Sequence, residues 1–264
     1  MKLLENKVAL VTASTRGIGK AIVKVFAENG AKVYLAVRNL ELGEQVAKEL
    51  GAAGVVHFDT LYPETFEGCV KDLLKKEGRI DVLVNNYGGT DVAKDIDIVN
   101  GDTEAMARVI NINLTVAMST AKAAIPAMIA QGGGSIVNIS SSQSLRPDIN
   151  RPAYGMAKTA INSLTQNIAC EFGKNNIRCN AVLPGLTLTD AVAKSMPGYW
   201  LDMYNYVIPM ARPSKPEDQA NAVLFFASDL SSHVSGQLLA VDGACSTTNP
   251  IYGLYPFMKP PAKD

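Results

Sequence analysis

The sequence contains few of the residues that build metal centres and cysteine-based catalytic sites. Its 264 residues include two histidines and four cysteines, and Cys69, Cys170, Cys179 and Cys245 form no CxxC pair. A zinc site or a catalytic Cys/His constellation is therefore not expected. We predict no metal site and reduced thiols, as in a cytoplasmic protein.

The chain also lacks an excess of either charge and any segment suited to a membrane. Lys plus Arg and Asp plus Glu number 25 each, so no overall basic field attracts nucleic acid or an anionic membrane surface. The N-terminus MKLLENKVALVT has an acidic residue within its first apolar stretch and no cleavage site, unlike a signal peptide. No apolar run approaches the roughly 20 residues that span a bilayer. We expect a cytoplasmic protein with no nucleic-acid or membrane partner.

Short apolar runs, in contrast, are abundant and alternate with longer segments of helical period. Seven runs predict strands, at 7–12, 31–37, 54–59, 81–86, 134–140, 177–183 and 237–242. Six segments predict helices, at 17–29, 41–50, 63–77, 102–130, 153–174 and 216–228. Several strands are apolar on both faces, so the alternation predicts an α/β fold: a single doubly wound Rossmann domain over 1–264, with a seven-stranded parallel sheet flanked by helices on both faces. We assign cofactor binding to about residues 1–130, and catalysis and substrate binding to about 131–264.

Two stretches interrupt this alternation. Residues 184–215 have no clean period and contain the large side chains Met196, Trp200, Met203, Tyr204, Tyr206 and Met210. Residues 245–264, rich in Pro and Tyr, add no obvious element after the last strand. We interpret 196–210 as a lid over an apolar ligand, with core or subunit-contact residues as the alternative. The tail is interpreted as a segment that crosses to a neighbouring subunit, with a frayed terminus as the alternative.

The turn after the first strand, VTASTRGIGKA at 11–21, is suited to bind a phosphate. In a doubly wound sheet this turn faces the ligand crevice, and the following helix offers free N–H groups. Gly17 and Gly19 let the backbone approach closely, although the common G-x-G-x-x-G spacing is absent. Arg38 directly follows the second strand, where an acidic residue would bind a ribose hydroxyl. Arg16 and Arg38 are therefore expected to bind a 2′-phosphate and to favour NADP(H) over NAD(H), unless both are solvated surface residues.

Four polar residues are expected to form a second part of the site. Tyr154 and Lys158 lie four residues apart in a predicted helix and so share one face, which alone is weak evidence. Ser141 follows the fifth strand, 13 residues before Tyr154, and Asn113 lies in the preceding long helix. Because ligands bind at the carboxyl ends of such strands, these side chains are predicted to meet there.

These motifs together resemble the short-chain dehydrogenase/reductase family over almost the whole chain. The matching segments are TASTRGIG, NNYG after the fourth strand, the Asn113, Ser141, Tyr154, Lys158 tetrad, PGLTLT after the sixth strand and VDGA at the seventh. The resemblance implies hydride transfer between a nicotinamide and a carbonyl or secondary alcohol. It implies that Ser141 hydrogen-bonds the substrate oxygen, that Asn113 holds a water, and that Tyr154 exchanges the proton. Lys158 and the nicotinamide cation are expected to lower the tyrosine pKa from about 10.

The resemblance also implies contacts with the cofactor. Lys158 would hold the nicotinamide ribose, Asn86 and Gly88 the adenosine side, Asp59 the adenine and Thr189 the nicotinamide amide. The full set assigned to NADP(H) is Thr12, Ser14, Thr15, Arg16, Gly17, Ile18, Gly19, Arg38, Asp59, Asn86, Gly88, Tyr154, Lys158, Leu186, Thr187 and Thr189. The chain departs from the family's pattern at Ala13 (usually Gly), Tyr87 (usually small) and Ala157 (often Ser). None of these changes removes a catalytic group, and we expect Ala13 to be tolerated in spite of its β-carbon.

Some strings resemble a narrower group, the bacterial NADP-dependent 7α-hydroxysteroid dehydrogenases. They include GRIDVLVNNYGGT (78–90), INSLTQNIA (161–169) and NIRCNAVLPGL (176–186), and the likeness fades after residue 187. This resemblance implies a bile acid or another steroid as substrate and a homotetramer. The alternatives are another short-chain reductase, such as a 3-oxoacyl-carrier-protein reductase or a sugar alcohol dehydrogenase, and a catalytically silent NADP-binding regulator, against which the intact tetrad argues.

Overall fold

A seven-stranded parallel sheet runs through the structure, a computed structural model that describes residues 2–249 and 251–257. The strands are β1 (Val8–Thr12), β2 (Lys32–Val37), β3 (Gly54–His57), β4 (Val82–Asn85), β5 (Gly134–Ile139), β6 (Ile177–Pro184) and β7 (Leu238–Val241). They follow the order β3-β2-β1-β4-β5-β6-β7, and each neighbouring pair is parallel. All seven predicted strands and the parallel sheet are confirmed. The order reverses between β1 and β4, which marks the ligand crevice of such a fold.

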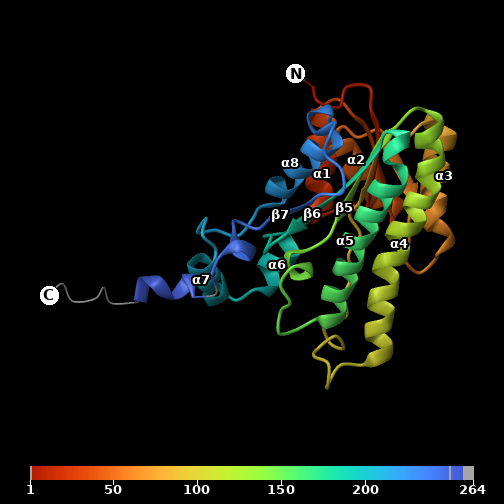
Figure 1. Ribbon diagram of the computed structural model, residues 1–264. Coiled ribbons are helices and arrows are strands. Elements are labelled where there is room, and N and C mark those ends of the chain that lie inside the picture. The colour runs from red at the N-terminus through yellow and green to blue at the C-terminus, as the bar shows by residue number, and fades with distance from the viewer. Residues whose placement is uncertain (1, 250, 258–264) are drawn as a thin grey trace.

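Helices cover both faces of the sheet (Figure 1). One face carries α1 (Gly17–Glu28), α2 (Leu40–Leu50) and α8 (Pro216–Ala227), and the other carries α3 (Glu64–Glu77), α4 (Thr103–Ala130) and α5 (Pro152–Phe172). Each layer has its own apolar core: Phe26 and Phe226 are buried in the first, and Phe66 and Met128 in the second. The six predicted helices are confirmed, with each boundary within two residues, and the fold is the doubly wound Rossmann fold.

The helix ends follow local sequence signals. Asn39 and Asp102 precede α2 and α4, and their side chains accept hydrogen bonds from the backbone N–H groups of Leu42 and Ala105. Such bonds satisfy donors that have no partner within the helix. Gly51 ends α2 in the left-handed conformation, with φ of 69°. Glycine is favoured there because a β-carbon would be strained.

Among the described residues, α4 is the helix that is long and apolar enough to cross a membrane. It has 28 residues, and a window of 18 residues within it has a mean hydropathy of 1.3. In this fold, however, α4 packs beside α3 and α5 (Figure 1), and 44% of that window is buried. Val116, Ala121 and Met128 of α4 belong to the core on this face of the sheet. The apolar character of α4 thus corresponds to its position in the protein core.

The stretch predicted to be irregular, 184–215, contains two helices that the sequence pattern did not indicate. They are α6 (Asp190–Ser195) and α7 (Gly198–Val207), and neither buries a residue. Because neither helix has a buried face, the sequence shows no apolar period there. The base of the stretch is closed where Thr187 bridges Ser214. Residues 188–213 therefore form one excursion from the carboxyl edge of the sheet.

The described part of the tail also has structure, which corrects the expectation that it adds no element. Two 3₁₀ helices follow β7, at Cys245–Thr247 and Tyr252–Phe257. The second of them packs against α7, at the left of Figure 1 and away from the sheet. Residues 250 and 258–264, which belong to the segment predicted to reach a neighbouring subunit, lie outside the described residues.

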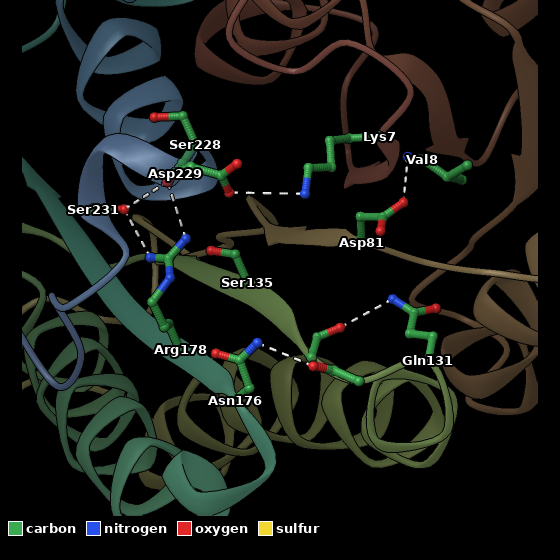
Figure 2. A network of polar contacts seen from close by, with 12 residues as sticks. Lys7, Val8, Asp81, Gln131, Ser135, Asn176, Arg178, Ser228, Asp229 and Ser231 are labelled. Atoms are coloured by element: carbon green, nitrogen blue, oxygen red, sulfur yellow. Dashed lines mark hydrogen bonds and ion pairs between the residues drawn. The ribbon is translucent and has the colours of Figure 1, made fainter.

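The amino ends of the strands carry a polar network, shown in Figure 2. Arg178 in β6 donates hydrogen bonds to the side chain of Ser231 and to the backbone carbonyls of Phe226 and Ser228. The cations here have partners: Lys7 pairs with Asp229, and Arg79 with Asp81. The charged groups of this network therefore serve to join strands, helices and loops. The opposite edge, at the carboxyl ends of the strands, contains the predicted site.

Candidate active site

The glycine turn joins the end of β1 to α1 and leaves a helix N-terminus available. Arg16 is the residue before the first turn of α1, and in the described structure no side chain caps this end. Gly17 has φ of 55°, and a β-carbon on it would lie 3.1 Å from Cγ2 of Thr189. Unpaired N–H groups and the positive end of the helix dipole suit this turn to bind an anion.

Several predicted cofactor residues hold the turn against β4. Asn86 donates from Nδ2 to the carbonyl oxygens of Thr12 and Ala13, at 3.0 and 3.1 Å. The hydroxyl of Thr12 accepts from the backbone N–H of Asn86, at 2.9 Å, and Ser14 donates its hydroxyl to the Val11 carbonyl. The side chains of Thr12, Ser14 and Asn86 therefore shape the turn through its own backbone.

The two arginines predicted to bind a phosphate are exposed at this end of the sheet. In the described part of the chain neither Arg16 nor Arg38 forms an ion pair, so both guanidinium groups are free to bind an anion. Val37 ends β2 and Asn39 caps α2, which leaves no carboxylate at this position. Asp59, which follows β3, is buried and accepts a hydrogen bond from the backbone N–H of Leu61.

A cavity of about 580 Å³ lies at the carboxyl edge of the sheet. The predicted site residues that line it are Ile18, Asn86, Gly88, Ser141, Tyr154, Lys158, Leu186, Thr187 and Thr189. The structure therefore brings the end of the glycine turn, two of the catalytic elements and the loop after β6 to one space. The predicted residues outside its lining are Thr12, Ser14, Thr15, Arg16, Gly17, Gly19, Arg38, Asp59 and Asn113.

Tyr154 and Ser141 meet in this cavity. Ser141 follows β5, Tyr154 lies in the first turn of α5, and their side chains are hydrogen-bonded. Burial raises the pKa of the Tyr154 hydroxyl, whereas the bond with Ser141 and the positive charge of Arg151 act in the opposite direction. The effect of burial dominates, and the cation that opposes it is Arg151. That Lys158 and the nicotinamide cation together lower this pKa stays a prediction.

Lys158 is fully enclosed below the tyrosine. Its Nζ lies 5.6 Å from the centre of the Tyr154 ring and donates to the Ile139 carbonyl at 2.9 Å. Burial lowers the pKa of the Lys158 ammonium to about 8, because it disfavours the charged form. Gly88 closes the space on the other side, since a β-carbon there would lie 3.0 Å from this Nζ.

Asn113, the fourth member of the tetrad, is buried in α4 behind the cavity wall. Its Nδ2 donates to the carbonyls of Gly89 and Val109, both at 2.8 Å, and its Oδ1 accepts from the Gly89 N–H at 3.2 Å. The amide therefore holds the loop after β4. Its predicted role in binding a water stays a prediction.

The expectation of a methionine-rich lid is only partly met. Of the six large side chains singled out between 196 and 210, Tyr204 alone lines the cavity, together with the neighbouring Ile208. Met203 on α7 is 55% exposed, and Met210, which follows this helix, is 63% exposed. The apolar wall of the cavity comes from Leu186, Val192 and Ile208, of which only Ile208 lies within 196–210.

Charged residues that sequence reasoning missed lie at the same cavity. Arg146, Asp148 and Arg151, in the connection between β5 and α5, all line it. Arg151 pairs with Asp148 at 3.7 Å, and its guanidinium lies 5.8 Å from the Tyr154 ring centre. Asp242 after β7 is also buried in the lining. The sequence signal for these residues was the segment RPDINR (146–151), which has three charges shortly before AYGMAK.

The three departures from the family's pattern have structural explanations. Ala13 adopts a φ of 53°, so this position does require the left-handed conformation. The Tyr87 ring is half-buried and packs against the core residue Phe58 at a centroid distance of 6.1 Å. Ala157 is fully buried in α5. None of the three side chains lines the cavity.

An anion-binding turn, free arginines and a buried lysine beside a tyrosine and a serine, all at one edge of a Rossmann sheet, indicate a dinucleotide-dependent oxidoreductase. Comparison with known proteins agrees. A family model described as enoyl-(acyl carrier protein) reductase matches residues 12–246. The chain belongs to the short-chain dehydrogenase/reductase family, and it is an oxidoreductase that uses a nicotinamide cofactor.

Three curated relatives illustrate the similarity. The 7alpha-hydroxysteroid dehydrogenase of Clostridium sardiniense is 48% identical, over 97% of this chain and 99% of that protein. The 7alpha-hydroxysteroid dehydrogenase of Paraclostridium sordellii is 43% identical, over 96% of each chain. The 3-oxoacyl-[acyl-carrier-protein] reductase of Chlamydia trachomatis is 37% identical, over 91% of this chain and 98% of that protein.

Solved structures share the fold. A short-chain type dehydrogenase/reductase from Mycobacterium ulcerans superposes with a TM-score of 0.87 at 29% identity, covering 96% of this chain and 94% of that one. A gluconate 5-dehydrogenase from Burkholderia cenocepacia, in complex with NADP and tartrate, superposes with a TM-score of 0.86 at 28% identity and covers 93% and 97% of the two chains.

Proposed function

We propose that the protein is an NADP(H)-dependent 7α-hydroxysteroid dehydrogenase that interconverts the 7α-hydroxyl group of a bile acid and the 7-ketone. The observation that carries the proposal is the placing of Ser141, Tyr154 and Lys158 around one cavity that has an apolar wall and a cationic rim. The identities of 48% and 43% with two 7alpha-hydroxysteroid dehydrogenases, over nearly whole chains, support the choice of substrate.

The residues present fit nicotinamide adenine dinucleotide phosphate, NADP(H). The glycine turn is too crowded for side chains at Gly17 and Gly19 and offers backbone donors, while Arg16 and Arg38 supply cations without partners in the described structure. When bound, the nicotinamide would supply or accept the hydride. A single charge-assisted hydrogen bond contributes about 1.5–3 kcal/mol, so Arg38→Ala is expected to raise the KM for NADP by about 10- to 100-fold and to leave that for NAD unchanged.

The chain's own residues account for the proton transfer. The Ser141 hydroxyl holds the substrate oxygen next to the side-chain oxygen of Tyr154. The ionised tyrosine takes the proton during alcohol oxidation, and the protonated tyrosine gives it up during ketone reduction. Lys158 uses one of its three N–H groups on the Ile139 carbonyl, which leaves two for ribose hydroxyls. Lys158 is buried, so its hydrogen bonds act in a low dielectric.

The lining of the cavity suits the apolar and the charged parts of a bile acid. Its rigid hydrocarbon rings suit the wall of Leu186, Val192 and Ile208, and its side-chain carboxylate suits the cations Arg146 and Arg151 at the rim. We further propose a cytoplasmic homotetramer with no nucleic-acid or membrane partner. The exposed apolar side chains Met118 and Ile129 on α4 support contacts between subunits.

The deciding experiment is incubation with NADP and cholate, followed by identification of the oxidised position. We expect NADPH absorbance to appear and the product to carry the ketone at carbon 7, with mannitol and acetoacetyl thioesters converted poorly. A ketone at carbon 3 or 12, or efficient reduction of acetoacetyl thioesters without cholate oxidation, would contradict the proposal. Tyr154→Phe is expected to lower kcat by about 10²- to 10⁴-fold. If NADPH binds but no substrate turns over, the chain is instead a silent NADP-binding regulator.

A further inference from the structure

Asp95 lies in the connection between β4 and α4, and its carboxylate reaches the first turn of the helix that carries Tyr154. Its Oδ1 accepts from the backbone N–H of Ala153 at 2.9 Å, and its Oδ2 accepts from that of Tyr154 at 3.0 Å. Its carbonyl oxygen accepts from the N–H of Arg151 at 3.1 Å. Asp95 is 1% exposed, although Val92 in the same loop is 69% exposed.

The N-terminus of α5 needs this carboxylate because its own sequence supplies no cap. Arg151 precedes the helix in the left-handed conformation, with φ of 61°, and in the described structure its side chain caps nothing. Pro152 has no N–H group, so Ala153 and Tyr154 carry the free donors of the first turn. Asp95, which is 58 residues before Ala153, takes the place of a local cap, and its negative charge matches the positive end of the helix dipole.

The same loop is held at its other end by the catalytic centre. Gly89 exchanges two hydrogen bonds with the amide of Asn113, and Thr90 donates its hydroxyl to Oδ2 of Asp95 at 3.4 Å. Gly88, the preceding residue, lies against Nζ of Lys158. A chain of contacts therefore runs from Asn113 through residues 88–95 to the backbone of Tyr154.

We propose that Asp95 is a positioning residue that sets the place of the Tyr154 hydroxyl relative to Ser141 and to the loop at Gly88. It acts through the backbone of α5 and does not line the cavity. An amide at this position presents one oxygen in place of two, and its NH₂ group faces a backbone N–H. Asp95→Asn is thus expected to release the first turn of α5. The inference rests on the proposed role of Tyr154 in hydride-coupled proton transfer.

The test compares Asp95→Asn with Asp97→Asn in full-length enzyme. Asp97 is a matched control, because its carboxylate accepts hydrogen bonds from Val99 and Asn100 within its own turn of the same loop. We expect Asp95→Asn to lower kcat by about 10- to 100-fold with KM for NADP changed less than about threefold. The rise of oxidation rate with pH is expected to move to higher pH, since the bond that favours the ionised tyrosine is weakened. Hydrogen exchange of the 152–158 peptide should accelerate, and Asp97→Asn should match wild type throughout.

Two results would overturn the proposal. One is an Asp95→Asn enzyme with wild-type kcat and pH profile. The other is a variant whose thermal midpoint falls while the kcat of its folded fraction and the pH profile stay the same, because this would make the contact merely structural. Failure of the proposed function is distinguishable: if wild type oxidises no bile acid but converts another alcohol or ketone, the substrate assignment fails, and the same comparison on that substrate still decides the role of Asp95.

Discussion

Gly19 in α1 and Asn86 after β4 touch across the glycine turn. A β-carbon on Gly19 would lie 2.5 Å from Nδ2 of Asn86 and 2.8 Å from the Ala13 carbonyl oxygen. The second contact is with backbone, which cannot rotate away, and the first is with a side chain held by two hydrogen bonds. The turn therefore keeps its shape because position 19 has no side chain.

Gly19→Ala is expected to lower the free energy of unfolding by about 1–3 kcal/mol and to weaken cofactor binding, because the overpacked turn must shift away from the sheet. Thermal melts and NADPH titration measure the two effects. Gly68→Ala in α3 is the matched control, since a β-carbon there meets nothing within 4 Å. It should raise stability by up to about 1 kcal/mol, as Ala is the better helix former. Equal stability changes in the two variants would contradict the packing argument.

Ala13→Gly is expected to stabilise the protein. Ala13 holds a φ of 53°, a conformation that costs an alanine about 1–2 kcal/mol and a glycine almost nothing. Part of this gain is offset by the greater freedom of glycine in the unfolded chain, so we expect a net gain of about 1 kcal/mol, or a rise in Tm of about 2–4 °C. A lower Tm would show that the alanine methyl group contributes more by packing than its backbone strain costs.

The sheet was predictable because each strand is a short apolar run closed by a turn signal, as both faces of a parallel sheet require. The helical structure of residues 188–213 was not predictable, because α7 has no buried residue and its sequence therefore shows no apolar period. Tyr154, Lys158 and Gly19 could be found from spacing along the chain. Asp95 and Arg151 could not, because their roles depend on a contact across 58 residues and on a left-handed residue before α5.

Lys158→Met is expected to stabilise the fold at neutral pH while it abolishes activity. The folded-state pKa of Lys158 is about 8, below its ordinary 10.5, so holding the charged form inside the protein costs about 3 kcal/mol below pH 8. The lost hydrogen bond to Ile139 offsets about 1 kcal/mol of the gain. Above pH 8 the buried lysine loses its proton, so the advantage of the variant should shrink and vanish above pH 10.5. Urea unfolding at pH 6.5, 8 and 9.5 measures the difference in the free energy of unfolding between the variant and wild type. A difference that does not change with pH would refute the lowered pKa of Lys158.

Alcohol oxidation and ketone reduction are expected to depend differently on pH. Oxidation needs the ionised Tyr154, whose pKa is raised by burial, so kcat/KM for oxidation should rise through pH 7–9. Reduction needs the protonated form, which dominates over this range, so its rate should stay flat. The Arg151 charge lowers this pKa, and Arg151→Met should therefore shift the oxidation limb to higher pH. Steady-state rates in both directions test this. If kcat/KM for oxidation rises over the same pH range in Arg151→Met as in wild type, Arg151 does not lower the tyrosine pKa.

Arg146 is expected to select substrates that carry a negative charge. It lines the cavity, donates from Nη1 to the Thr248 carbonyl at 3.0 Å, and takes part in no ion pair within the described chain, whereas Arg151 is balanced by Asp148. Arg146→Met should raise the KM for cholate by about threefold to tenfold, a modest factor because the group is exposed to solvent. The KM for the uncharged methyl ester of cholate should stay the same.

Salt and a second arginine provide the controls for this prediction. Because ions screen exposed charges, added salt should raise the KM of wild type for cholate and leave that of Arg146→Met almost unchanged. Arg108→Met on α4, where the guanidinium pairs with Glu104 outside the cavity, should behave as wild type. If Arg146→Met weakened cholate and its methyl ester equally, the side chain would act by packing, and the acidic end of the substrate would be bound elsewhere.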